Sequence, residues 1–295
     1  THNSSNQLFN PHAKPFPDRE PMCNAGFTTR GIVLGTDFIT DICLFSLKIK
    51  EPRRLKPGYY STNVVLRTIC EALSKAASKI LEIEPSDVLA EFRPALTPAG
   101  QKGQEVEIFL YDTLPGGAGL SSQLPRHARK LFETALDILM NCAEGCNSSC
   151  YRCLRTFRNK FDHSLLDRYV GAELIQLLLN GIEPTPNQDL ISTNLQYLFE
   201  DLARNAPSGF KCELNKGVAI PDIGEIMAPI LISTGTKKYI ITLSGALAPD
   251  VSLNFPTVNS LPANIMVLKP IDELLVKLNL PSATKFVYSS ISEMK

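Results

Sequence analysis

The chain has 295 residues, of which 44% are hydrophobic and 20% are charged, a mixture typical of globular proteins. Its 30 Lys and Arg residues balance its 30 Asp and Glu residues, so any nucleic-acid surface must be local. No apolar run approaches the roughly 18 residues of a membrane span, which argues against a membrane protein.

Residues 1–29 are polar and rich in proline, and they offer little from which a core could form. This composition predicts an extended tail or linker. Because the chain opens on Thr1 rather than Met, we expect it to be the C-terminal piece of a longer protein, or one subunit of a complex.

Residues 30–181 are predicted to form a mixed α/β domain. Val65, Ile69 and Leu73 recur at helical spacing, which predicts a helix with Thr62 as its N-cap. The predicted elements of this region, in chain order, are strand structure at 30–50, the helix at 62–83, a turn and strand at 85–96, a buried strand at Val106–Thr113, a glycine turn at 114–120, a helix at Leu120–Met140 and a helix at 163–181.

A change of composition at Ile182–Asp189, with two prolines and several polar residues, predicts a domain boundary. Residues 190–295 are then predicted to form a small α+β domain of ordinary size. Its predicted elements are a helix at 193–207, strands at 209–215, 229–234 and 237–247, and a strand followed by a short helix at 265–281.

Four cysteines lie within twelve residues: Cys142, Cys146, Cys150 and Cys153. Four thiolates at this density can surround one tetrahedral Zn²⁺ ion. Two disulfides would require an oxidising compartment, and the chain shows no secretory signal, so we expect one structural zinc and a cytoplasmic protein. His163 is an alternative ligand, but four thiolates already complete a closed site, which favours a structural role for this histidine.

Basic and aromatic side chains are interleaved after the cysteines. Between Arg126 and Arg168 there are eight Lys or Arg residues against five Asp or Glu residues, a local basic excess. Arginines held by a metal-fixed loop can contact a DNA backbone, and rings beside them can stack on unpaired bases. Alternatively, the arginines pair with Glu144, Asp162 and Asp167. The candidate DNA-binding residues are Arg152, Arg155, Arg158, Lys160, Arg168, Tyr151 and Phe157.

The turn at 114–119 carries Gly116, Gly117 and Gly119 and joins a predicted strand to a predicted helix. Free N–H groups at the start of that helix can face a phosphate. The turn is not a Walker A loop, because no Gly-Lys-Ser/Thr follows it. Alternatively, Asp112 hydrogen-bonds the glycine amides and the turn is purely structural.

Three stretches in this order resemble the DUF1998 domain, a zinc-binding module of MrfA-like, DISARM-type and Druantia-type helicase proteins. They are GIVLGTDFITDICLF, VEIFLYDTLPGGAGLSSQL and CAEGCNSSCYRCLRTFRNKFDHSLLDR, and the resemblance covers about residues 30–181.

The resemblance implies a non-catalytic accessory region of a superfamily 2 DNA helicase or translocase, acting in DNA repair or antiphage defence. Such a region would contact DNA of undetermined structure or dock on a helicase motor, in the same polypeptide or in a partner chain.

Two other functions stay open. The segment 219–222, Ala-Ile-Pro-Asp, faintly resembles the Pro-Asp motif of restriction-type nucleases, which would make the C-terminal domain a Mg²⁺-dependent nuclease. Such a site needs further carboxylates to hold the metal, and the following segment 229–234 carries neither an acid nor a lysine. No catalytic residue is therefore assigned. The third function is a protein-interaction subunit without affinity for DNA.

Overall fold

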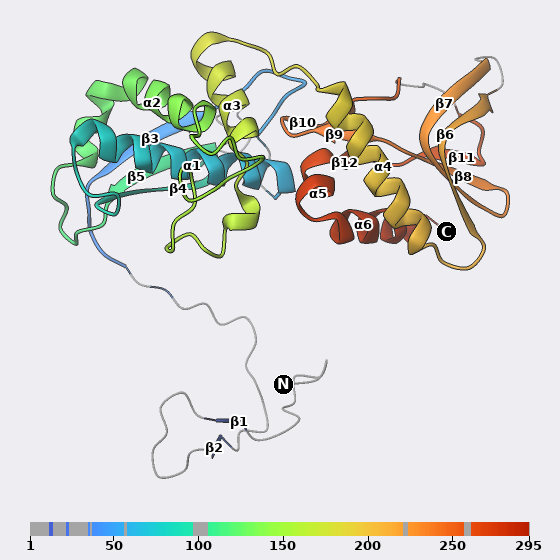
Figure 1. Ribbon diagram of the computed structural model, residues 1–295, viewed down its shortest axis with the longest axis horizontal. Coiled ribbons are helices and arrows are strands. Elements are labelled where there is room, and N and C mark those ends of the chain that lie inside the picture. Colours follow the sequence, from blue (N-terminus) through green and yellow to red (C-terminus); the bar gives the residue numbers. More distant parts are fainter. Residues whose placement is uncertain are drawn as a thin grey trace. The chain divides into compact units, whose positions relative to one another are not determined.

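The computed structural model describes most of the chain (Figure 1). The described residues are 12–13, 22–23, 35, 37–55, 58–96, 106–220, 224–256 and 261–294. The chain forms two units, Thr1–Ile39 and Thr40–Lys295. In the described part of the first unit, strands β1 (His12–Ala13) and β2 (Met22–Cys23) pair antiparallel. Most of the tail predicted for residues 1–29 lies outside the described residues.

The second unit opens with a three-stranded antiparallel sheet in the order β3-β5-β4. Its strands are β3 (Ile42–Leu47), β4 (Val88–Pro94) and β5 (Val106–Asp112). Side chains of a strand alternate between its two faces, so the registered residues Cys43, Leu110 and Ala90 all point into the core.

Five helical segments complete this half of the unit. They are α1 (Tyr60–Leu81), the 3₁₀ helix η1 (Ser121–His127), α2 (Ala128–Met140), the 3₁₀ helix η2 (His163–Leu165) and α3 (Arg168–Asn180). Helix α1 packs against β4, α2 and α3. Pro125 lies inside η1 and has no N–H to donate, which is consistent with a 3₁₀ turn ahead of the regular helix α2. Gly181 ends α3 with a left-handed φ of 65°.

The rest of the second unit combines helices with two small sheets. Its elements are α4 (Gln188–Arg204), β6 (Phe210–Ile220), β7 (Gly224–Thr234), β8 (Lys237–Ile241), β9 (Leu243–Gly245), β10 (Ala248–Ser252), β11 (Ile265–Val267), β12 (Ile271–Asp272), α5 (Glu273–Leu278) and α6 (Leu280–Glu293). The sheet orders are β11-β8-β7-β6 and β10-β9-β12. Helices α4 and α6 pack on each other and share a core with β7 and β8.

The two halves of the second unit share buried residues. The core built by β3–β5 and α1–α3 also contains Ala246, Leu247 and Leu274 from the C-terminal half. The carboxylate of Asp272, at the start of α5, accepts a hydrogen bond from the Ser61 N–H in the first turn of α1 at 2.7 Å. The domain boundary predicted near residues 182–189 stays a prediction.

The mixed α/β class predicted from the sequence is confirmed, with differences at several element ends. Helix α1 begins at Tyr60, so Thr62 is a buried residue of its first turn and not the N-cap. Helix α4 begins at Gln188, because the side chain of Asn187 caps it earlier than expected. Strand structure predicted over 30–50 is described only at 42–47. Strand β10 and helix α6 had not been predicted.

The faint nuclease motif of the C-terminal half, Pro221 and Asp222, lies outside the described residues. Segment 229–234 forms part of β7, where Ile230, Leu231 and Ile232 are buried. Within the described ranges, every helix is too short or too polar to cross a lipid bilayer.

Candidate metal centre and nucleic-acid interface

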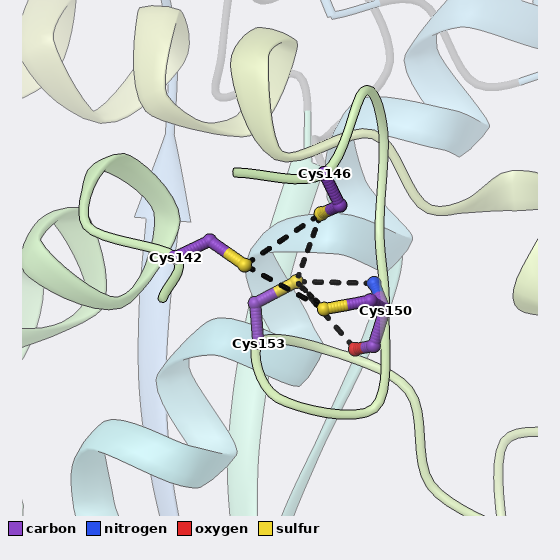
Figure 2. Close-up of side chains that lie close together, drawn as sticks. All are labelled: Cys142, Cys146, Cys150 and Cys153. Atoms are coloured by element: carbon purple, nitrogen blue, oxygen red, sulfur yellow. Dashed lines mark hydrogen bonds between the residues drawn. The ribbon is translucent and has the colours of Figure 1, made fainter. Parts of the chain in front are cut away.

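The four cysteine side chains converge on one point (Figure 2). The first follows the end of α2, and all four lie on the connection between α2 and α3. The Sγ atoms of Cys142 and Cys150 are 3.5 Å apart, and three further pairs are 3.7 Å apart. All four sulfur atoms lie within 4.8 Å of one another. Cys153 is buried, and the other three cysteines are half-buried at the edge of the core.

These distances fit a zinc site and exclude disulfides. A tetrahedral site with Zn–S bonds of about 2.3 Å places its sulfur atoms about 3.8 Å apart. A disulfide would need about 2.05 Å between sulfurs, and all four cysteines are free. The four residues therefore fit one structural zinc ion, as the sequence predicted. Four thiolates leave no open position for a water, so the site lacks the usual arrangement of a catalytic zinc.

The backbone shapes the loop that carries the ligands. The carbonyl oxygen of Cys150 accepts N–H groups from Cys153, Leu154 and Arg155 at 2.9–3.2 Å, which turns the chain tightly between the last two ligands. The Cys150 N–H also approaches the Cys153 sulfur at 3.2 Å. Gly145 takes a left-handed φ of 55° between the first two ligands, a conformation that costs glycine little.

Without a cation, the crowded sulfur atoms do not all ionise readily. Backbone N–H groups, first that of Cys146, lower the pKa of Cys142 to about 6. Burial and the neighbouring thiols raise the pKa of Cys146 to about 12. A divalent cation removes this conflict, because it deprotonates thiols that coordinate it.

Arg168 corrects one sequence prediction. The residue was expected on the DNA surface, but it is only 6% exposed. Its guanidinium donates to the carbonyl oxygens of Cys146 at 2.8 Å, Leu139 at 2.9 Å and Met140 at 3.1 Å. It also donates to the Tyr169 hydroxyl at 2.7 Å. Arg168 thus donates hydrogen bonds to carbonyl groups at the end of α2 and links them to the zinc loop, the segment from Cys142 to Cys153. We therefore remove Arg168 from the proposed DNA surface.

Two lysines from distant helices also hold the zinc loop. Lys75 of α1 donates to the carbonyl oxygen of Cys153 at 2.6 Å. Lys277 of α5 pairs with the buried Asp167 at 2.5 Å and reaches the carbonyl oxygen of Asn147 at 3.4 Å. Sequence reasoning missed both lysines, because each acts on a partner 78 to 130 residues away and shows no local motif.

The loop after the last ligand is held by Asn159 and His163. The buried Asn159 side chain accepts from the Thr156 N–H at 2.8 Å and donates to the Leu154 carbonyl at 3.0 Å. His163 Nε2 lies 2.9 Å from the Thr156 carbonyl oxygen, and its ring packs edge-on against Tyr151. His163 is absent from the cysteine cluster, in agreement with the structural role favoured from the sequence.

The predicted DNA-binding residues on either side of the last ligand, Cys153, differ in accessibility. Arg152, Arg158, Lys160, Tyr151 and Phe157 are exposed. Arg155 is half-buried and donates to the Ser149 hydroxyl at 3.0 Å.

Nearby acids engage these cations only in part. Glu144 lies 3.6 Å from Arg152. Asp162 lies 3.7 Å from Arg67, a residue of α1, and Asp167 pairs with Lys277. Among the described residues, Arg158 and Lys160 form no ion pair. Both side chains are exposed.

The glycine turn is occupied by protein carboxylates. Asp112 is fully buried at the end of β5. Its two oxygens accept three N–H groups at 2.7–3.0 Å, those of Ala118, Leu120 and Ser121. Asp41 accepts the Gly119 N–H at 3.0 Å, and a Cβ on Gly117 would collide with the Asp41 carboxylate.

These contacts support the structural role for the turn, because the two carboxylates already bind the amides that a phosphate would use. Phosphate contact by Gly116, Gly117 and Gly119 stays a prediction. The Mg²⁺-dependent nuclease suggested as an alternative function would need a second metal site. The cysteines form the only cluster of His, Cys, Asp and Glu suited to a metal among residues 37–55, 58–96, 106–220, 224–256 and 261–294.

A structural zinc site built into a mixed α/β domain defines the class of this protein. Residues 69–154 match the family model of the MrfA Zn-binding domain. This match and the similarity to a Druantia protein, given below, confirm the resemblance to DUF1998 proteins that the sequence suggested.

Two curated proteins resemble the chain. Druantia protein DruE of Escherichia coli (strain UMEA 4076-1) is 29% identical over 262 residues, which cover 85% of this chain and 13% of that protein. The uncharacterized protein MJ1572.1 of Methanocaldococcus jannaschii is 32% identical over 73 residues, which cover 25% of this chain and 63% of that protein. The chain thus spans a small part of the length of DruE.

Among solved structures, the crystal structure of the DUF1998 helicase MrfA bound to DNA matches with 21% identity and a TM-score of 0.34. The match covers 47% of this chain and 16% of that chain.

Proposed function

We propose that this chain is a non-catalytic, zinc-binding accessory region of a helicase-type protein and that its post-zinc loop contacts DNA. The post-zinc loop is the segment from Leu154 to Asp162. The main support for this proposal is the arrangement of charge next to the four-cysteine site. Arg158 and Lys160 are exposed on the loop that follows the site, and neither forms an ion pair among the described residues. The match to the MrfA Zn-binding domain and the similarity to DruE support the helicase context.

The proposed contact is electrostatic. Arg152, Arg158 and Lys160 are exposed near one metal-fixed loop, and Arg155 lies beside them. Cations held by a rigid loop lose little conformational freedom when they bind phosphates, and each contact releases condensed counterions from DNA. The zinc holds these cations in place and takes no part in a reaction.

The proposed setting is DNA repair or antiphage defence, next to a motor that lies in the same polypeptide or in a partner chain. A site of four reduced thiols suits the cytoplasm, which is the location we propose. The nuclease alternative depends on Asp222, and Mg²⁺-dependent DNA cleavage that Asp222→Ala abolishes would establish it.

The test compares two triple variants of the 295-residue chain. We expect Arg152→Ala/Arg158→Ala/Lys160→Ala to weaken DNA binding at least about tenfold at low salt. The slope of log affinity against log salt should become shallower by about one for each phosphate that the variant no longer binds. Fluorescence anisotropy of labelled DNA over a salt series measures both quantities.

The matched control removes three exposed cations from the other half of the unit, Arg204, Lys211 and Lys285. It changes the net charge equally and should leave the affinity within about twofold. Equal binding by both triple variants would show that Arg152, Arg158 and Lys160 do not form the DNA surface. A chain that binds no DNA at any salt concentration would favour the protein-interaction function.

A further inference from the structure

Two phenylalanines on the post-zinc loop point into solvent. Phe157 is 78% exposed and Phe161 is 85% exposed, although a phenylalanine normally buries most of its ring. The hydrogen bonds of Asn159 and His163 fix the backbone between them. The two exposed rings therefore lie on a backbone that side-chain hydrogen bonds hold in a defined conformation.

A cation accompanies both rings. The Lys160 ammonium lies 4.4 Å from the centroid of the Phe157 ring and 5.0 Å from that of Phe161. These distances are within the range of cation–π contact. The three side chains, which we term the Phe-Lys-Phe cluster, thus combine flat apolar surfaces with a positive charge.

The electrostatics around the Phe-Lys-Phe cluster favour an anionic occupant. Asp162 follows Phe161 directly, but its carboxylate faces Arg67 at 3.7 Å. Glu144 lies beside Arg152. Among the described residues, neither Lys160 nor Arg158 has a carboxylate partner. A partner that offers flat faces together with negative charge is complementary to this surface.

We propose that the Phe-Lys-Phe cluster is a stacking platform for unpaired bases, which makes single-stranded DNA the preferred ligand of the post-zinc loop. Bases of a single strand stack on aromatic side chains, whereas bases inside a duplex are already stacked on each other. Lys160 contacts the phosphates between the stacked bases. This inference rests on the proposed function and adds the form of DNA that is recognised.

The absence of tryptophan from the chain provides a direct probe of stacking. Phe157→Trp and Phe161→Trp each introduce a single tryptophan at the platform. We expect an oligothymidylate of about 16 nucleotides to quench this fluorescence, and a duplex of equal length to quench it far less. A single tryptophan at Tyr197→Trp, an exposed position on α4, should not respond to either ligand.

The second measurement is the affinity for single-stranded and duplex DNA. We expect Phe157→Ala/Phe161→Ala to lose roughly 25-fold or more in affinity for the oligothymidylate and less than about twofold for the duplex. Phe286→Ala, which removes an exposed ring from α6, should change neither affinity. One zinc per chain in each variant confirms that the loop is intact.

The outcomes separate this inference from the proposed function. If the unmodified chain binds DNA but the double Phe variant binds both ligands normally, the platform is refuted and the basic contact stands. Quenching at Phe157→Trp by duplex as strong as by single strand would also refute it. No binding of any DNA by the unmodified chain would refute both proposals.

Discussion

Asp112 is a carboxylate without access to solvent, and three backbone N–H groups point at it. Burial raises its pKa, but the hydrogen bonds from Ala118, Ser121 and Leu120 outweigh burial, so the net shift is downward. The anion is therefore the form that the glycine turn requires. The carboxylate of Asp112 accepts the backbone N–H groups of this turn, as a phosphate accepts those of a phosphate-binding loop.

We predict that Asp112→Asn destabilises the chain by about 2 kcal/mol or more at pH 7, because an amide cannot accept all three N–H groups as an anion does. The contribution of Asp112 is present above its unfolded pKa of about 3.9 and is lost as the pH falls through the lower folded value. The stability difference between the two proteins should therefore shrink below about pH 4. Urea unfolding at several pH values measures it.

The control for this prediction is Asp137→Asn on the exposed side of α2, which should change stability by less than about 0.5 kcal/mol. A destabilisation by Asp112→Asn no larger than that of the control would show that the three hydrogen bonds do not hold the turn.

At the scale of elements, acidic side chains gather where α3 meets α5. Burial, with the charge of Asp167, raises the pKa of Glu173 to about 7. Burial, followed by the charges of Glu173 and Asp272, raises the pKa of Glu273 to about 7. Lys277 acts in the opposite direction on both glutamates but does not cancel the shift. The contact between these helices is thus most favourable when the two glutamates carry protons.

We predict that the chain loses stability as the pH rises from about 4.5 to about 7. In that window the folded state holds protons that the unfolded state has released, so each pH unit favours unfolding. Glu173→Gln/Glu273→Gln should flatten this slope and raise stability at pH 8 by about 1–3 kcal/mol. Thermal melting in a series of buffers from about pH 5 to about pH 8 measures the slope for both proteins.

Glu200→Gln, on the exposed face of α4, serves as the control and should keep the slope of the unmodified chain. If the double variant and the unmodified chain showed the same dependence on pH, the two glutamates would be ionised in the folded state at neutral pH.

At the scale of the whole molecule, local sequence patterns were sufficient for the metal ligands and for most elements. Four cysteines within twelve residues identify their own site, because short spacing brings the sulfurs together whatever the rest of the chain does. Apolar periodicity likewise predicted α1.

Contacts between distant segments were beyond the reach of such patterns. The guanidinium of Arg168 was expected to contact DNA or to pair with an acidic side chain, but it donates to carbonyl groups 22 to 29 residues earlier. In the first turn of α1, the Ser61 N–H donates to the carboxylate of Asp272, 211 residues later in the chain, and the predicted N-cap, Thr62, was wrong. Neither partner is marked by residue type or spacing, because only the packed fold brings the segments together.

The zinc loop touches helices from both halves of the unit, through Lys75 of α1, Arg168 of α3 and Lys277 of α5. We predict that Cys150→Ser/Cys153→Ser contains no zinc and that its backbone amides between residues 141 and 166 exchange hydrogen much faster, because the ligand loop has no large core of its own. The β7 and β8 amides should stay protected by their separate core. Cys212→Ser, outside the cluster, should keep one zinc and the original exchange pattern. Uniform loss of protection would instead make the zinc essential to the whole fold.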